Sequence, residues 1–257
     1  MVWRRWGSGP RTIVLQHGGH GTWSHWFRNI PALAERYTVL AADLPGCGES
    51  DNPPEPYDGH SLADIVVAGL DRLVDSSSPP MHLVGFSFGG VLGGPVAARL
   101  GQKLASLTLV GSAGLGLPRP ERHGMKSWRR LTDNTEILSA HRQNLGVLMF
   151  ANPSTIDDMS LYLQNRNTRA CRLRSTNVSR TSILRDSLMD ISAGLNGIWG
   201  ERDIVVEGYL KNAEKLLRGM HPELAFEAIP DAGHWVAYEA ADRFNATLLK
   251  MLSARET

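Results

Sequence analysis

Short apolar runs alternate along the chain with longer segments in which apolar residues recur at helical spacing. The runs are bounded by turn-forming residues, which predicts buried strands. We expect these strands at 12–16, 37–42, 81–86, 104–110, 194–199 and 224–229, with one more N-terminal strand over 2–6. Helices are expected at 23–36, 61–75, 88–100 and 207–218, and from the loop after residue 234 to residue 253. Strands that alternate with helices in this way predict a parallel sheet that is covered on both faces.

The alternation stops between residues 115 and 191. This stretch has helical patterns and many arginines but no clear strand. Connections of such length usually serve as lids or binding elements. We therefore expect an α/β core formed by residues 1–114 and 192–257, interrupted by a helical cap over 115–191.

The motif Gly-x-Ser-x-Gly at residues 85–89 follows a predicted buried strand and opens a predicted helix. A nucleophile elbow has this form: the serine sits on a sharp strand-to-helix turn that needs small neighbours, here Gly85 and Gly89. The motif is short enough to occur by chance in an ordinary glycine-rich turn. On its own it makes Ser87 a candidate nucleophile and no more.

Two further loops at predicted strand ends supply the partners that a serine nucleophile needs. Ligands of an open parallel sheet bind at the carboxyl ends of the strands. His234 follows the strand over 224–229 and is the candidate general base, and Asp203 follows the strand over 194–199 and is the candidate acid that orients it. Asp203 would also suit a helix N-terminus, and Asp231 is the alternative acid. The chain order Ser, Asp, His is that of the α/β-hydrolase arrangement.

Acyl chemistry also requires donors for an oxyanion. The backbone N–H of Phe88, directly after the candidate nucleophile, is one expected donor, and that of Gly19 is the other. Gly19 belongs to a His17-Gly18-Gly19 loop after the first buried strand. We expect His17 itself to brace this loop.

Composition excludes several other classes. The chain has 257 residues, a net charge of +1 and 42% hydrophobic residues, so it can bury a full core and is not built for nucleic acid. It has no apolar run of the ~18 residues needed to span a bilayer, and we expect no membrane association. No secretory signal is recognisable, so the cytoplasm is the expected location. Cys47 and Cys171 are expected to be buried or incidental thiols. No phosphate-loop or metal-ligand spacing occurs, so no cofactor or metal is expected.

Taken together, the chain resembles the α/β-hydrolase superfamily over almost all its length. The stretches that carry the likeness are His17-Gly18-Gly19, Asp43-Leu44-Pro45-Gly46-Cys47-Gly48-Glu49-Ser50, Gly85-Phe86-Ser87-Phe88-Gly89-Gly90, Trp199-Gly200-Glu201-Arg202-Asp203 and Gly233-His234-Trp235. Within the superfamily it looks most like the meta-cleavage-product hydrolases, which cut a C–C bond in 2-hydroxy-6-oxo-dienoates. Three features point there: the sequence after Ser87, Trp235 directly after the base, and an arginine-bearing cap.

The resemblance implies further site residues. In that family a cap arginine binds the carboxylate and 2-oxo group of the substrate, a role that suits a planar guanidinium. Arg172 and Arg174 are the candidates here, in a segment that is crowded with arginines (Arg166, Arg169, Arg172, Arg174 and Arg180). Gly18, His20 and Trp235 are the other candidate substrate contacts. His20 stands where the family usually carries a third glycine, which is a departure from its pattern.

Three hypotheses about function follow. The first is a serine-nucleophile hydrolase that cuts a C–C bond in a ring-cleavage product, and the second is a carboxylesterase on small or medium esters. The third is a binding protein on the same scaffold that turns over slowly. All three require a small-molecule carbonyl ligand. The sequence leaves open whether the chain forms a homo-oligomer.

Overall fold

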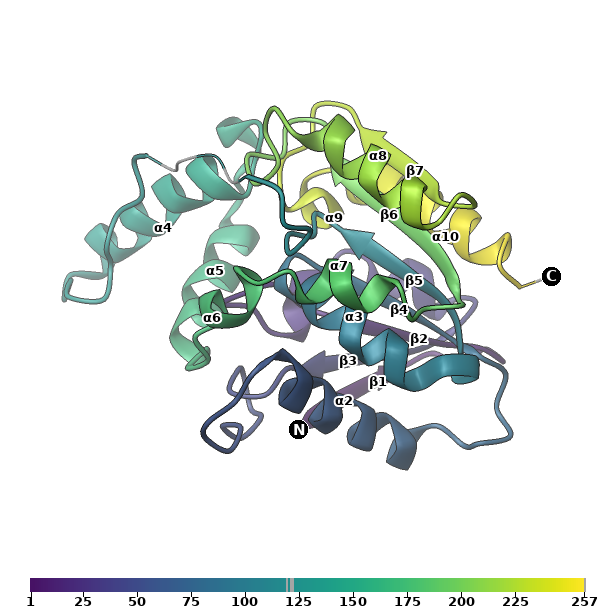
Figure 1. Cartoon of the computed structure of the whole chain (residues 1–257). Coiled ribbons are helices and arrows are strands. Elements are labelled where there is room, and N and C mark those ends of the chain that lie inside the picture. The colour runs from purple at the N-terminus through teal and green to yellow at the C-terminus, as the bar shows by residue number, and fades with distance from the viewer. Residues whose placement is uncertain (119, 121–122, 257) are drawn as a thin grey trace.

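The computed structural model of this chain describes residues 1–118, 120 and 123–256, and it is built around a seven-stranded sheet (Figure 1). The strand order is β1-β3-β2-β4-β5-β6-β7, with β1 antiparallel to β3 and the remaining pairs parallel. The strands are β1 (Val2–Trp6), β2 (Thr12–Gln16), β3 (Thr38–Asp43), β4 (Met81–Phe86), β5 (Leu104–Val110), β6 (Gly194–Gly200) and β7 (Ala225–Ile229). The predicted α/β fold with a mostly parallel sheet is therefore confirmed.

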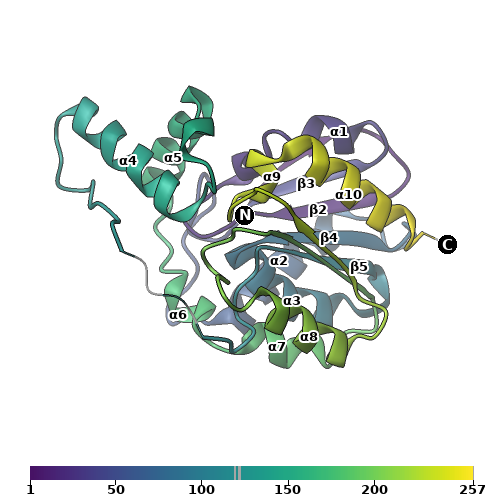
Figure 2. The same cartoon turned by 90° about the horizontal axis from the view of Figure 1, so that it is seen from above.

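Helices cover both faces of this sheet (Figure 2). One face carries α2 (Gly59–Leu73), α3 (Phe88–Leu100), α7 (Ile183–Leu188) and α8 (Leu210–Met220). The other carries α1 (Ile30–Ala34), α9 (Val236–Glu239) and α10 (Ala241–Ser253). Each layer has its own buried apolar cluster, so the central strands are apolar on both sides, as parallel strands between two helical layers must be.

Strand β4 lies at the centre of the sheet, between β2 and β5. All of its residues are buried. The register sets Gly85 beside Gln16 of β2 and Leu109 of β5. The turn that follows β4 therefore emerges in the middle of the carboxyl edge, with loops from both sides of the sheet around it.

Four predicted helices differ from the observed ones at their boundaries. Helix α8 begins at Leu210 and not at residue 207, and the last predicted helix is divided into α9 and α10. The other two differences have local causes. The segment 23–36 is a 3-10 turn, η1 (Trp23–Trp26), followed by α1, because the buried Asn29 between them bonds instead to Ala237 O and Asn245 Oδ1, both at 2.8 Å. Helix α2 begins before Ser61: Asp58 is its N-cap, and Ser61 completes a capping box as the third helical residue.

The inserted segment divides into two parts. Helices α4 (Asn134–Leu148) and α5 (Asp158–Ala170) project away from the sheet (Figures 1 and 2). The chain then returns through α6 (Thr176–Ser179) to α7, which packs on α3 with Leu184 fully buried. Within the described part of 115–191 there is no strand. The elements past residue 175 therefore lie against the core, while α4 and α5 overhang it.

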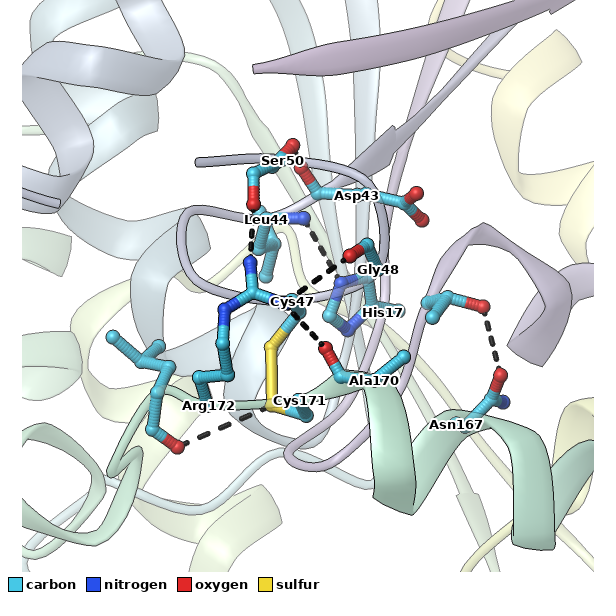
Figure 3. Close-up of a disulfide and its surroundings, with 12 residues drawn as sticks. His17, Asp43, Leu44, Cys47, Gly48, Ser50, Asn167, Ala170, Cys171 and Arg172 are labelled. Atoms are coloured by element: carbon cyan, nitrogen blue, oxygen red, sulfur yellow. Dashed lines mark hydrogen bonds between the residues drawn. A yellow bond between two sulfur atoms is a disulfide. The ribbon is translucent and has the colours of Figure 1, made fainter. Parts of the chain in front are cut away.

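Cys47 and Cys171 are both buried, but they form a disulfide, so the expectation of two free thiols is wrong (Figure 3). The sequence separates them by 124 residues. They meet because the chain leaving α5 crosses the loop after β3. The pairing also weakens one ground for expecting the cytoplasm, since disulfides persist mainly in oxidising compartments. No helix of the described residues is both long and apolar enough to cross a membrane.

Candidate active site

Ser87 occupies a backbone conformation that side chains rarely adopt. Its φ is 50° and its ψ is −112°, in a region that costs free energy for any residue but glycine. Its neighbours permit the turn: a Cβ at Gly85 would collide with the carbonyl oxygen of Gly89, and a Cβ at Gly89 with that of Gln16. The Ser87 N–H donates to Val110 O at 2.8 Å, which ties the turn to β5.

The structure brings Ser87, His234 and Asp203 together. His234 Nε2 lies 2.9 Å from Ser87 Oγ, and His234 Nδ1 lies 3.0 and 2.9 Å from the two carboxylate oxygens of Asp203. Asp203 and His234 are both buried. The carboxylate accepts Nδ1–H, which leaves Nε2 free to accept the serine proton. Asp231, the alternative acid, has no such contact with the imidazole.

Gly111 makes room for this Asp–His pair. It follows β5 with a φ of +53°. A Cβ there would lie 3.1 Å from Asp203 Oδ2 and 3.2 Å from His234 Nδ1. Sequence reasoning missed this residue, because it noted only that the loop after β5 lacks a carboxylate.

Two buried histidines hold the loop that carries Gly18 and Gly19. His17 Nε2 accepts the Leu44 N–H at 3.0 Å, so Nδ1 carries the proton and donates to Gly18 O at 2.7 Å. His25 Nδ1 accepts the Gly18 N–H at 3.2 Å. Burial lowers the pKa of His17 to about 4, and burial with nearby histidines holds the pKa of His25 well below its usual range. Both imidazole rings are therefore neutral at physiological pH, and they hold the loop in place through these hydrogen bonds.

A cavity of about 270 Å³ opens over Ser87. Gly19 and Phe88, the expected oxyanion donors, line it, as do Gly18 and His20. The remaining lining residues are Phe86, Ala113, Met125, Leu148, Met149, Ser175, Thr176, Ser179, Val205 and His234. His20 has a positive φ of 54° and is exposed at the mouth, where partial enclosure of its ring and the charge of Arg129 lower its pKa.

The arginines proposed as substrate ligands lie elsewhere. Neither Arg172 nor Arg174 lines the cavity. The Arg172 guanidinium instead donates to Ser50 O at 2.5 Å (Figure 3). It also donates to Asn52 Oδ1 at 2.8 Å. The reason is the backbone, because the Arg172 N–H bonds to Gly46 O at 2.8 Å and fixes the segment along the loop after β3. Among the described lining residues there is no arginine or lysine.

Trp235 also stands outside the cavity. It is fully buried behind the site, and its indole Nε1–H donates to His25 O at 3.0 Å. Its ring lies 5.0 Å from that of His25. This placement makes Trp235 a support for the histidine braces, in contrast to the expected substrate contact.

Sequence reasoning missed the cap residues that do line the cavity. Met125, Leu148 and Met149 come from its first part, and Ser175, Thr176 and Ser179 from its return. No motif distinguishes them. In its described residues the cap has no strand that would align it with the sheet, so packing determines the face that it turns to Ser87. No cluster of potential metal ligands occurs within the described residues.

Comparison with known proteins agrees with this architecture. A 2-hydroxy-6-oxo-6-phenylhexa-2,4-dienoate hydrolase of Burkholderia cepacia is 31% identical over 96% of this chain and 89% of its own. A dihydrolipoyllysine-residue acetyltransferase component of an acetoin cleaving system, from Pseudomonas putida, is 30% identical over 96% of this chain. The chain spans 64% of the length of that second relative.

Solved structures show the same fold. A meta-cleavage product hydrolase from Pseudomonas fluorescens IP01 matches with a TM-score of 0.77 at 23% identity, over 98% of this chain and 93% of its own. A thermophilic esterase from Thermogutta terrifontis matches with a TM-score of 0.71 at 21% identity, over 100% of this chain and 94% of its own. The model of the alpha/beta hydrolase family matches residues 13–247. This chain therefore belongs to the alpha/beta hydrolase family and is related to the meta-cleavage product hydrolases.

Proposed function

We propose that this protein is a serine hydrolase in which Ser87 is the nucleophile, His234 the general base and Asp203 the group that orients it. The observation that carries the proposal is the continuous relay from Ser87 Oγ through the imidazole to the buried carboxylate. Serine is a weak nucleophile at its free pKa, and a base within hydrogen-bonding distance activates it.

The reaction follows from this relay. Ser87 Oγ attacks the substrate carbonyl carbon while His234 Nε2 takes its proton. The N–H groups of Gly19 and Phe88 hold the oxygen as it becomes negative. His234 returns the proton to the leaving group, and water then releases the acyl group from Ser87 by the same steps in reverse.

For the substrate, we propose an uncharged acyl compound such as a small ester. The cavity supports this choice, because its described lining offers hydroxyl groups and apolar side chains but no arginine or lysine. Among the described lining residues a substrate carboxylate would find no permanent cation to pair with, and burying an unpaired charge is costly. Arg129, whose charge acts on His20, does not line the cavity.

The second candidate is hydrolysis of a C–C bond in a 2-hydroxy-6-oxo-dienoate. It is favoured by the Burkholderia cepacia relative, whose name describes that activity, and by that relative's coverage of nearly this whole chain. The relay and the oxyanion donors serve either bond. The two candidates differ in the remainder of the substrate: the dienoate carries a carboxylate that the protein must bind, whereas the ester is uncharged.

Loss of the nucleophile tests the proposal as a whole. Turnover of p-nitrophenyl butyrate should fall at least 10³-fold in Ser87→Ala, while Ser78→Ala, in an exposed loop, should retain it. Steady-state turnover of the ester also separates an enzyme from a slow binding protein, whereas labelling by a fluorophosphonate would show only that Ser87 is activated. Full activity in Ser87→Ala would refute the proposal.

The ratio of kcat/KM on p-nitrophenyl butyrate to that on 2-hydroxy-6-oxo-6-phenylhexa-2,4-dienoate separates the two bond types. We expect the ester to be preferred. If the dienoate is preferred, Arg172→Ala decides whether Arg172 is its ligand. If Arg172 binds the dienoate, its replacement would raise KM for the dienoate alone. The observed placement of Arg172 instead predicts that the replacement changes kcat/KM equally for both substrates.

A further inference from the structure

The side chain of Ser175 forms part of the cavity wall over Ser87. The residue as a whole is only 7% exposed. It precedes α6, but its side chain does not cap that helix. A serine hydroxyl on a cavity wall that is not used as a helix cap is available to hydrogen-bond a bound substrate.

The position of this hydroxyl indicates which substrate atom it meets. Ser175 Oγ lies 2.9 Å from the point where a Cβ on Gly19 would stand, and Phe88 Cβ lies 3.8 Å from the same point. Ser175 therefore shares one corner of the cavity with the two residues whose N–H groups are the proposed oxyanion donors. A serine hydroxyl rotates freely and can donate toward that corner.

We propose that Ser175 is a further catalytic residue, which donates a hydrogen bond to the substrate carbonyl oxygen as it becomes an oxyanion. The inference rests on the proposed serine-hydrolase function and extends it to the cap. The oxyanion site would then combine donors from three parts of the chain: Gly19 in the loop between β2 and η1, Phe88 at the start of α3, and Ser175 in the cap.

The chain before Ser175 is anchored to the core in a way that fixes this hydroxyl. Cys171 is joined to Cys47, and the N–H groups of Arg172 and Leu173 both bond to Gly46 O, at 2.8 and 3.2 Å. Leu173 is buried in the core cluster. The Arg172 guanidinium adds hydrogen bonds to the same loop, at Ser50 O (Figure 3) and at Asn52 Oδ1. Arg172 is thus a positioning residue for a cap serine.

Removal of the hydroxyl tests the proposal. With p-nitrophenyl butyrate, Ser175→Ala should lower kcat by about 10- to 100-fold with little change in KM, because an oxyanion donor acts mainly in the transition state. The inhibition constant of a trifluoromethyl ketone, which forms an oxyanion adduct with Ser87, should rise by the same factor. Ser182→Ala is the matched control, since its hydroxyl bonds to Asp186 outside the cavity.

Two companion variants guard against a purely structural effect. Ser175→Cys keeps a side chain of similar shape with a much weaker donor, so it should show a loss close to that of Ser175→Ala at an unchanged melting temperature. Arg172→Ala should also lower kcat, and its effect should largely vanish in the Ser175→Ala background, because both act through one contact.

The outcomes separate this inference from the proposed function. Wild-type kcat in Ser175→Ala, or a rise in KM with no change in ketone inhibition, would overturn the role of Ser175 while leaving Ser87 as nucleophile. Activity that survives Ser87→Ala would instead overturn the proposed function itself.

Discussion

Gly111 is the residue whose lack of a side chain matters most directly to the Asp203–His234 pair. Its positive φ and the short distances from a Cβ to both partners mean that any side chain would strain the backbone and push against the pair. Gly101 has almost the same φ, +51°, but nothing within 4 Å of its Cβ position. A substitution at Gly101 would therefore strain the backbone only, whereas one at Gly111 would also crowd the Asp203–His234 pair.

We predict that Gly111→Ala lowers kcat by at least about 10-fold, because displacement of the carboxylate or imidazole by under 1 Å breaks the relay. Gly101→Ala should leave kcat unchanged and lower the free energy of unfolding by about 1 kcal/mol, the cost of its left-handed φ. Steady-state kinetics and urea unfolding measure the two effects. Equal kcat in the two variants would contradict the role given to Gly111.

At the residue scale, Ser87, Asp203 and His234 could be predicted from the sequence. Gly111 and Ser175, whose roles depend on their neighbours in space, could not. Ser87 stands directly after β4, and Asp203 and His234 lie in the loops that follow β6 and β7, so the sheet itself brings them together. Gly111 also follows a strand, but a glycine carries no chemistry to single it out. Ser175 depends on a contact between two loops far apart in sequence, which no local pattern encodes.

Among the elements, the segment 171–174 links the cap to the core. It holds one half of the disulfide and two backbone bonds to Gly46 O. A link between residues 124 apart removes many conformations from the unfolded chain. Its effect should therefore appear in the free energy of unfolding.

We predict that reduction of the Cys47–Cys171 disulfide lowers the free energy of unfolding by about 2–4 kcal/mol. Urea unfolding with and without dithiothreitol measures the change. The double variant Cys47→Ser/Cys171→Ser should be insensitive to the reductant and resemble the reduced wild type. A wild type that unfolds at the same urea concentration in both states would show that the link adds nothing.

The apolar pattern predicted the strands well because a strand between two helical layers must be apolar throughout. It failed over 23–36, where apolar spacing continues across Asn29 although the side chain of that residue bonds to two C-terminal elements. It also failed to show which cap helices overhang the sheet, since the local pattern of a helix does not specify its neighbours: α7 packs on α3, whereas α4 packs on α5.

At the scale of the whole molecule, buried neutral histidines make stability depend on pH. The pKa of His17 is about 4 in the folded protein, against 6.5 in the unfolded chain. The unfolded state therefore binds more protons between these values, and stability is lost as the pH falls from 6.5 toward 4. His25, His82 and His141 shift in the same direction because of burial.

We predict that a change from pH 7.5 to pH 5 costs about 2 kcal/mol of unfolding free energy through His17 alone. His17→Gln, which keeps an acceptor for the Leu44 N–H, should reduce this pH dependence. His60→Gln, at an exposed position, should not. Urea unfolding at both pH values provides the comparison, and a stability that is flat across this range would contradict the prediction.

The cap contributes to the cavity wall through two different segments of the chain. Met125, Leu148 and Met149 belong to the overhanging stretch, whereas Ser175 belongs to the segment bound to the core. A recombinant in which residues 124–170 are replaced by those of a relative would inherit new apolar selectivity without disturbing the anchored serine. Substitutions within residues 124–170 can therefore change the substrate range, while the anchored segment keeps Ser175 in place.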